Sequence, residues 1–134
     1  MELIQLTDTL YVSGQPTPPD ISQLAERGFT LLICNRPDGE SPGQSRMDDI
    51  EALAHQHGMA FMRYPVNPVN FPGDDLEGLG RAFDGPGKIL AYCRTGTRCT
   101  NLWLATRAQE ELPAARDQAQ ALGFDLSLVS RLSS

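Results

Sequence analysis

The sequence lacks an excess of basic residues. Its 134 residues include 11 lysines and arginines against 17 aspartates and glutamates, for a formal net charge of -6. A protein that binds nucleic acid or an anionic membrane surface needs a positively charged face, so the composition argues against both partners. Against this acidic background, the two arginines Arg94 and Arg98 are conspicuous because they lie close together in one short segment.

Cysteine and histidine are also scarce, and their spacing excludes two common uses. The three cysteines, Cys34, Cys93 and Cys99, are odd in number and irregularly spaced, unlike the cysteines of a disulfide framework. There is no Cys-x-x-Cys pair, and His55 and His57 are the only histidines, so we do not expect a zinc site. No motif indicates another metal or an organic cofactor.

Long apolar runs are absent as well. Residues Met1–Gln5 lack the basic and apolar regions of a signal peptide, and no stretch is long enough to span a bilayer. We therefore expect no membrane partner and a reducing cytoplasmic location, which suits a working thiol. A hydrophobic content of 40% in 134 residues is enough for one core, so we expect a single domain over residues 1–134.

The sequence does contain an alternation of strand-like and helix-like segments. Apolar runs predict strands at four places, namely Leu10–Gly14, Phe29–Cys34, Met59–Val66 and Ile89–Tyr92. Apolar residues at helical spacing predict helices that begin near six positions, namely Thr17, Met47, Leu76, Asn101, Pro113 and Phe124. This alternation predicts an α/β fold of three layers, with a mostly parallel sheet of four or five strands between two layers of helices.

The most informative segment follows the last predicted strand and reads Cys93-Arg94-Thr95-Gly96-Thr97-Arg98-Cys99. A strand, a short loop with a central glycine and a helix N-terminus form a cradle whose backbone N–H groups bind anions. A cysteine at the entrance of this cradle would be stabilised as the thiolate, which is its nucleophilic form. Arg98 would hold the anion with paired donors. The plain alternative is a buried cysteine followed by two solvated arginines.

The other residues of this loop have two interpretations each. Arg94 either steers an anionic substrate or is simply solvated. The hydroxyls of Thr95 and Thr97 either bind the Cys93 sulfur and its bound group or only fit a tight turn. Cys99 either resolves an oxidised Cys93 as a disulfide or packs the helix onto the sheet as a small buried residue.

Charged residues on the loop after Phe29–Cys34 are candidates for an accessory role. Arg36, Asp38 and Glu40 follow this strand and would lie at the same edge of the sheet as Cys93. There Asp38 would position Arg98 or Arg36 by charge-assisted hydrogen bonds. The alternative is that Asp38 belongs to an ordinary turn, since Pro37-Asp38-Gly39 is a common turn sequence. Cys34 itself is predicted to be a core residue.

Four segments resemble those of known families. The segment Cys93–Arg98 resembles the Cys-x4-Arg loop of rhodanese-type sulfurtransferases, which is shorter than the Cys-x5-Arg loop of tyrosine and dual-specificity phosphatases. The segments Leu10–Pro16, Ile33–Glu40 and Tyr64–Val66 look like those of dual-specificity phosphatases. Together they are similar to one bacterial family, the phosphatase-like domain of the beta-lactamase-hydrolase-like proteins. This resemblance implies a fold like that of protein tyrosine phosphatases and a cysteine nucleophile.

The chain departs from the phosphatase pattern at the general acid. Dual-specificity phosphatases carry this acid, usually an aspartate, on the loop before the catalytic strand, where this chain has Asn67 and Asn70. Neither amide can protonate a leaving alkoxide. Asp74 and Asp75 follow on the same loop, and they would reach the site only if the loop folds over it. Otherwise they cap the helix that begins near Leu76.

The short loop and the missing acid favour sulfur transfer. In this hypothesis, Cys93 takes the outer sulfur of a small anionic donor such as thiosulfate and passes it, as a persulfide, to a thiol acceptor such as glutathione. The alternative is a phosphatase that hydrolyses phosphotyrosine or other phosphate esters through a phosphocysteine, with Arg98 on the phosphate and Asp74 or Asp75 as the acid. A third hypothesis is a binding module for anions or phosphopeptides that does not turn over.

Overall fold

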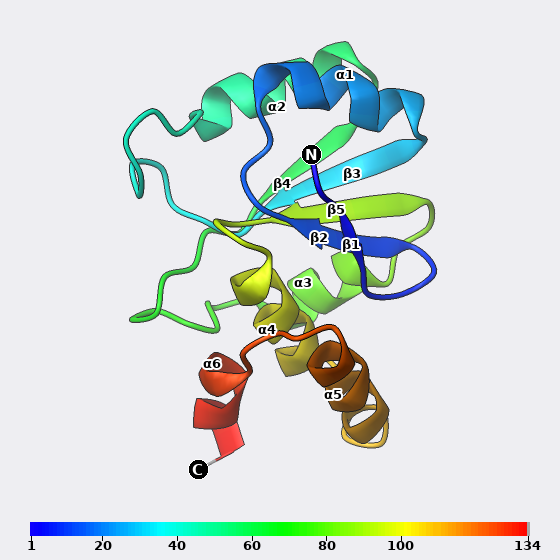
Figure 1. The fold of residues 1–134 in the computed structure, drawn as a ribbon, viewed down its shortest axis with the longest axis vertical. Helices are drawn as coiled ribbons and strands as arrows, with labels where there is room; N and C mark the ends of the chain where they lie inside the picture. Colours follow the sequence, from blue (N-terminus) through cyan, green and yellow to red (C-terminus); the bar gives the residue numbers. More distant parts are fainter. Residues whose placement is uncertain (134) are drawn as a thin grey trace.

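The computed structural model describes residues 1–133, which surround one five-stranded sheet (Figure 1). The strands in sheet order are β1 (Ile4–Gln5), β2 (Leu10–Ser13), β5 (Lys88–Tyr92), β3 (Phe29–Cys34) and β4 (Ala60–Arg63). All neighbouring pairs are parallel except β1 and β2, which run antiparallel. The prediction of an α/β fold with a mostly parallel sheet is therefore confirmed.

Helices cover both faces of this sheet (Figure 1). One face carries α1 (Pro18–Glu26) and α2 (Met47–Gln56). The other face carries α3 (Leu76–Phe83) and α4 (Thr97–Ala105), with α5 (Leu112–Ala121), α6 (Ser127–Ser130) and a short 3-10 turn (Arg131–Ser133) beyond them. The three layers follow from the crossover connections, because each parallel pair of strands needs a crossover that returns over one face of the sheet.

The central strands β3 and β5 are largely apolar because both of their faces are buried. Along β5, Leu90 and Tyr92 pack in the cluster under α1 and α2, whereas Ile89 and Ala91 pack in the cluster under α4. Side chains alternate between the two faces along a strand. Cys93, one position beyond β5, therefore falls on the α4 side.

Three boundaries differ from the sequence prediction. The edge strand β1 is only two residues long and was not predicted, because so short a segment carries no periodic pattern. Strand β4 ends at Arg63, although the apolar pattern continues to Val66. Helix α4 begins at Thr97, earlier than the apolar pattern near Asn101 predicts, because the loop turns directly into the helix at Gly96. The remaining helices begin within a few residues of their predicted starts.

The four parallel strands end at the same edge of the sheet, and their following loops gather there (Figure 1). These include the loop from β3 to α2, the loop from β4 to α3 and the loop from β5 to α4. Ligands bind at this edge in sheets of this kind.

Candidate active site

The loop from β5 to α4 places Cys93 at the centre of the sheet edge. The backbone N–H of Cys93 donates to the Ser13 carbonyl at the end of β2 (3.2 Å), so Cys93 extends the hydrogen bonding between β2 and β5 by one bond. Its side chain is nearly buried, with 1% of its surface exposed. Helix α4 begins four residues later, so the partial positive charge of the helix N-terminus lies close to the sulfur.

Two glycines allow this loop to close tightly. Gly96 has φ +89°, in the left-handed region, and a Cβ there would lie 3.3 Å from a methyl group of Val12. At the end of β2, a Cβ on Gly14 would lie 2.8 Å from the carbonyl oxygen of Arg94. The loop therefore packs against the end of β2 at backbone distance, which only glycine permits at both positions.

The Cys93 sulfur lies in a ring of donors. The Gly96 backbone N–H donates to it at 3.1 Å, and further hydrogen bonds come from the Cys99 thiol and from the backbone of Thr95 and Cys99. The bond from the Cys99 thiol contributes most to lowering the pKa of Cys93 to about 5, although burial opposes the change. At neutral pH, Cys93 is therefore a thiolate, as the motif predicts.

Cys99 contacts Cys93 from the first turn of α4. Its side chain is fully buried, and burial together with the neighbouring Cys93 sulfur raises its own pKa well above the usual value. Cys99 therefore stays protonated, and its thiol donates a hydrogen bond to the Cys93 thiolate. Cys99 is buried where α4 packs on the sheet, as the packing alternative predicts. Its thiol also lies close enough to Cys93 for the two cysteines to form a disulfide. That resolving role stays a prediction.

Arg98 is held by one edge of its guanidinium group. Its Nη1 donates to the Val66 carbonyl (2.7 Å), to the Asn35 carbonyl (3.3 Å) and to Glu40 Oε2 (3.0 Å). Its Nη2 donates to Glu40 Oε1 (3.3 Å). A guanidinium group has five N–H donors, and no residue within 1–133 accepts from Nε. The Nε–H and the adjoining N–H of Nη2 remain for an anion, which they can bind side-on.

Glu40 is shared by two arginines. Besides Arg98, it accepts from Nε of Arg36 (3.2 Å), whose side chain is only 3% exposed. Arg36 also donates to Gln15 Oε1 (3.2 Å) and to the Ser41 hydroxyl (3.1 Å). One carboxylate between two guanidinium groups leaves this trio with one positive charge, which balances the negative charge of the Cys93 thiolate.

The predicted role of Asp38 is therefore wrong. Asp38 Oδ1 accepts from the backbone N–H of Met47 (2.9 Å) at the start of α2, and Glu40 holds both arginines instead. The longer Glu40 side chain, two residues further along the turn, reaches them. The sequence prediction placed Glu40 on this loop, at the same edge of the sheet as Cys93, but assigned the contact to Asp38. The spacing of Arg36 and Glu40 by four residues was a further signal, which is weak outside a helix.

A cavity of about 250 Å³ opens above the thiolate. It combines the loop, one residue of the loop after β4 and one residue of α6, and its lining consists of Pro68, Cys93, Arg94, Thr95, Thr97, Arg98 and Leu128. Within the loop, the Thr95 hydroxyl bonds the Thr97 hydroxyl (3.0 Å) and accepts from its backbone N–H (3.4 Å), as expected of a tight turn. The side chain of Arg94 is exposed at the rim. No sequence pattern pointed to Pro68 or Leu128.

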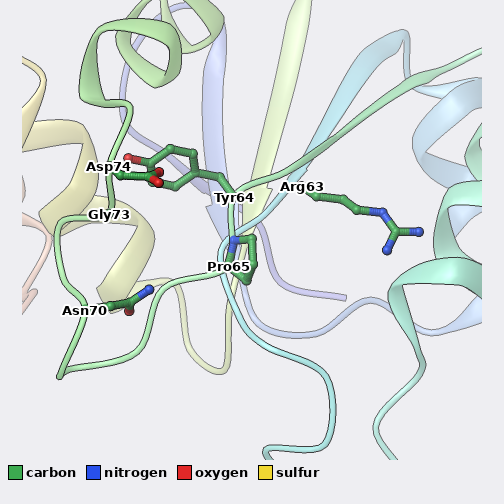
Figure 2. Close-up of a pocket in the computed structure, with 6 residues that line it drawn as sticks. All are labelled: Arg63, Tyr64, Pro65, Asn70, Gly73 and Asp74. Carbon is green, nitrogen blue, oxygen red and sulfur yellow. The ribbon is translucent and has the colours of Figure 1, made fainter.

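The two candidate acids lie elsewhere. Asp75 caps α3, where its Oδ1 accepts from the Gly78 backbone N–H (3.0 Å). Asp74 lines a separate cavity of about 460 Å³ and lies beside the Tyr64 ring, while Arg63 points away on the other side of the strand (Figure 2). Neither aspartate is among the residues that line the Cys93 cavity. Asp75 thus caps the helix, as the alternative interpretation predicts.

The asparagines of the same loop make a local turn. The Asn67 side-chain oxygen accepts from the backbone N–H groups of Val69 (2.8 Å) and Asn70 (2.9 Å). The Asn70 side-chain oxygen accepts from the backbone N–H of Asn67 (2.6 Å). Both amides are therefore engaged by the loop itself, and their position gives the Cys93 cavity no proton donor.

Cys34 and Tyr92 lie on the opposite face of the sheet from Cys93. Both belong to the apolar cluster under α1 and α2, and burial raises the pKa of each side chain. The Tyr92 hydroxyl is hydrogen-bonded to the side chains of Cys34 and Gln15. Cys34 is thus a core residue, as predicted. Tyr92, which precedes the nucleophile in the sequence, is directed away from it.

Residues 1–133 contain no candidate metal site and no candidate transmembrane helix. No group of three or more histidine, cysteine, aspartate or glutamate side chains in this range is placed to hold a metal ion. Within the same residues, no helix has both the length and the apolar character needed to cross a membrane. His55 and His57 are both exposed, near the end of α2.

Most of the chain, including the cysteine loop, matches a known protein family. Residues 2–110 match the family of the beta-lactamase hydrolase-like protein, phosphatase-like domain. The chain belongs to this family. The resemblance seen in the sequence is thereby confirmed, and it extends over all four strand-to-helix connections, β2–α1, β3–α2, β4–α3 and β5–α4.

Curated relatives of the family are much longer than this chain. A beta-lactamase hydrolase-like protein of Xylella fastidiosa (strain Temecula1) is 32% identical over 131 residues, which cover 94% of this chain and 30% of that protein. The corresponding protein of Agrobacterium fabrum (strain C58) is 28% identical and is covered to 31% of its length. The chain thus spans about three tenths of these relatives.

Solved structures of phosphatase-like proteins share the fold. A candidate phosphatase of Neisseria meningitidis Z2491 is 37% identical, with a TM-score of 0.79 over 98% of this chain and 96% of that one. A candidate phosphatase of Shewanella putrefaciens CN-32 is 23% identical, with a TM-score of 0.76 over 98% and 90%. Pseudomonas aeruginosa TpbA, solved with phosphotyrosine, is 16% identical, with a TM-score of 0.60 over 98% and 90%. The predicted tyrosine-phosphatase-like fold is confirmed.

Proposed function

We propose that the chain is a cysteine-dependent phosphatase that hydrolyses phosphate monoesters through a phosphocysteine on Cys93. The observation that carries the proposal is that the Cys93 thiolate and the Arg98 guanidinium line one cavity, with a pair of guanidinium N–H groups left unbound. The membership of the chain in a phosphatase-like family supports the same chemistry. This was the second of the three sequence hypotheses.

The proposed reaction has two steps. The Cys93 thiolate attacks phosphorus, the S–P bond forms, and the P–O bond to the leaving group breaks with its electron pair on oxygen. Water then attacks the phosphocysteine, the S–P bond breaks, and the thiolate and inorganic phosphate are released. The N–H groups of the loop and the free edge of Arg98 would bind the equatorial phosphate oxygens and stabilise the charge that develops on them.

Sulfur transfer, which the sequence favoured, stays a second candidate on one observation. The residues that line the Cys93 cavity include no carboxyl group, and sulfur transfer from thiosulfate needs no proton donor because sulfite leaves as a stable anion. The phosphatase-like proteins to which the chain is similar provide no support for a sulfur donor or for glutathione as the acceptor.

One pair of assays separates the two candidates. Release of inorganic phosphate from an aryl phosphate is measured first, with Cys93→Ser as the inactive variant and Cys34→Ser as the control for loss of a buried thiol outside the cavity. We expect phosphate release by wild type and Cys34→Ser and none by Cys93→Ser.

In parallel, wild type is incubated with thiosulfate and its intact mass is recorded. An adduct of one sulfur atom on Cys93, combined with no phosphate release, would replace the phosphatase proposal by sulfur transfer. If wild type and Cys93→Ser bind phosphate equally well and neither turns over either substrate, the protein is a binding module instead.

A further inference from the structure

Two of the oxygens that hold Arg98 are backbone carbonyls. Its Nη1 donates to the Val66 carbonyl (2.7 Å) and to the Asn35 carbonyl (3.3 Å). Asn35 is the first residue after β3, and Val66 lies on the loop after β4. A carbonyl cannot move independently of its chain segment, so the direction of the Arg98 side chain depends on how these two segments are fixed to each other.

Asn35 connects the two segments at the point where the regular pairing of β3 and β4 ends. That pairing ends at Cys34 and Arg63. Beyond it, the Asn35 side-chain amide donates to the Tyr64 carbonyl (3.1 Å), and the backbone N–H of Val66 donates to the Asn35 carbonyl (3.3 Å). The side chain of Asn35 therefore extends the connection past the last paired residues and holds the segment that carries the Val66 carbonyl.

The backbone of Asn35 is bonded on its other side to the strand that leads to the nucleophile. Its N–H donates to the carbonyl of Tyr92 (2.9 Å), which is the last residue of β5 and directly precedes Cys93. Asn35 thus joins the ends of β3, β4 and β5. Through these bonds, the Val66 carbonyl is held in a fixed relation to the end of the strand from which the Cys93 loop starts.

The amide of Asn35 is buried, and only one end of it is paired. The residue is 0% exposed, and its Oδ1 has no hydrogen-bond partner within residues 1–133. A buried acceptor without a partner lowers stability, so its presence needs an explanation. The other end of the amide supplies one, because Nδ2 makes a bond to Tyr64 that no apolar side chain could make.

We infer that Asn35 is a positioning residue for Arg98. Its side chain holds the Val66 carbonyl in place, so that Nη1 of Arg98 stays engaged and the free Nε–H edge stays available to an anion. The inference rests on the proposed function. Asn35 does not line the cavity and carries no charge, so it acts through the direction of Arg98. Glu40 differs, because it binds Arg98 directly and also carries a charge.

The thiolate and the guanidinium group should therefore respond differently to a change at Asn35. The donors to the Cys93 sulfur come from Thr95, Gly96 and Cys99, so the pKa of Cys93 should stay at about 5 without the amide. Phosphate binding should weaken, because it uses the free edge of Arg98. A residue that only stabilised the site as a whole would change both properties together.

The test compares wild type with Asn35→Leu, which removes the donor and keeps a similar volume. Affinity for inorganic phosphate is measured by calorimetry, kcat/KM on an aryl phosphate by steady-state kinetics, and the pKa of Cys93 by alkylation with iodoacetamide against pH. We expect the affinity and kcat/KM to fall about tenfold each, with the pKa unchanged. A misplacement of about 1 Å can cost about 100-fold, and the smaller loss is expected because Glu40 still holds Arg98.

Ile21→Val is the matched control for a loss of stability, because Ile21 is fully buried in α1 on the opposite face of the sheet from Cys93. It should match wild type in all three measurements. Asn35→Ala removes the same donor with less bulk and should reproduce the result of Asn35→Leu, which shows that the bulk of leucine is not the cause. Circular dichroism of each variant checks folding.

Three results would overturn the inference. Wild-type phosphate affinity in both Asn35 variants would show that Arg98 keeps its direction without the amide. A rise of about one pH unit or more in the pKa of Cys93, together with the loss of affinity, would show that the whole site is disturbed. An equal loss in Ile21→Val would assign the effect to stability.

Failure of the proposed function gives a different result. Wild type would then bind phosphate but would not release it from an ester in a Cys93-dependent way, and the phosphate affinities of the Asn35 variants would still decide the role of Asn35. A wild type that does not bind phosphate at all would contradict both the proposed function and the inference.

Discussion

The base and the walls of the Cys93 cavity differ in chemistry, because the base is charged and the walls are apolar. The base is a network of charges and donors in which the thiolate is bound by Gly96 and Cys99, and Arg98 is held by Glu40 with one guanidinium edge left unbound. The walls, Pro68 and Leu128, are apolar and carry no titratable group. The site thus combines a charged base with apolar walls, and none of the residues that line the cavity carries a carboxyl group.

The largest effect should come from breaking the contact between Glu40 and the two arginines. Glu40→Ala leaves Arg98 free to turn, and we expect kcat/KM on an aryl phosphate to fall about 100-fold, as for other misplaced substrate-binding groups. Glu40→Gln keeps one acceptor and should lose less. Steady-state kinetics with circular dichroism as the check on folding would measure this.

Asp38→Ala is the matched control for Glu40→Ala, because it removes a carboxylate from the same turn. Within residues 1–133, the Asp38 side chain is hydrogen-bonded only to the backbone N–H of Met47 at the start of α2, so its loss should cost about 1 kcal/mol of unfolding free energy, as for a lost helix cap, without a change in kcat/KM. If Asp38→Ala were the more damaging of the two for catalysis, the assignment of Glu40 as the positioning residue for Arg98 would be wrong.

The next effect concerns the donor to the thiolate. Cys99→Ala removes the thiol hydrogen bond that contributes most to the low pKa of Cys93. A hydrogen bond to a charged group is worth about 1.5–3 kcal/mol, and one pH unit corresponds to about 1.4 kcal/mol. We therefore expect the pKa of Cys93 to rise from about 5 by roughly one to two pH units. The rate of alkylation by iodoacetamide against pH measures it.

Cys99→Ser separates the hydrogen bond from the loss of volume. A serine hydroxyl still donates to the thiolate, so the pKa of Cys93 should stay closer to the wild-type value than in Cys99→Ala. Cys34→Ala, which removes a buried thiol on the other face of the sheet, should leave it unchanged. Equal pKa values in Cys99→Ala and wild type would show that the backbone donors alone hold the thiolate.

A smaller effect links the thiolate to stability. The pKa of Cys93 is about 5 in the folded chain and near 9 for an ordinary thiol. Between these values the unfolded chain holds the proton and the folded chain does not, so the free energy of unfolding contributed by Cys93 rises with pH and is lost as pH falls through about 5. Urea denaturation of wild type and Cys93→Ser across this range measures the difference, and parallel curves would contradict it.

The smallest effect should come from the loop that also carries Pro68. Asp74→Asn removes the carboxylate that faces the separate cavity beside Tyr64 (Figure 2). We expect kcat/KM on an aryl phosphate to change less than about threefold, since the loss of a general acid costs about 100-fold or more. A fall of that larger size would mean that the loop moves over Cys93 during the reaction and that Asp74 is the missing acid.

The sequence by itself determined most of the sheet, the loop after β5 and the place of Cys93 at its entrance. Largely apolar runs such as Phe29–Cys34 favour a strand buried on both faces, and the strand–loop–helix order around Gly96 makes an N–H cradle through local backbone geometry. The low pKa of Cys93 follows from that cradle together with Cys99, six residues away in the chain. Contacts of short sequence separation can be predicted because few conformations connect the residues.

Only the tertiary structure decided what surrounds the loop. Glu40, not Asp38, reaches Arg98 across 58 residues of sequence, and Leu128 reaches the cavity because Asn101 attaches α6 to α4. The conformation of the turn around Gly39 directs one carboxylate to α2 and the other to the arginines. Which carboxylate reaches the arginines depends on a few torsion angles in irregular loops. The sequence contains several carboxylates that could do so, and only the packed chain distinguishes them.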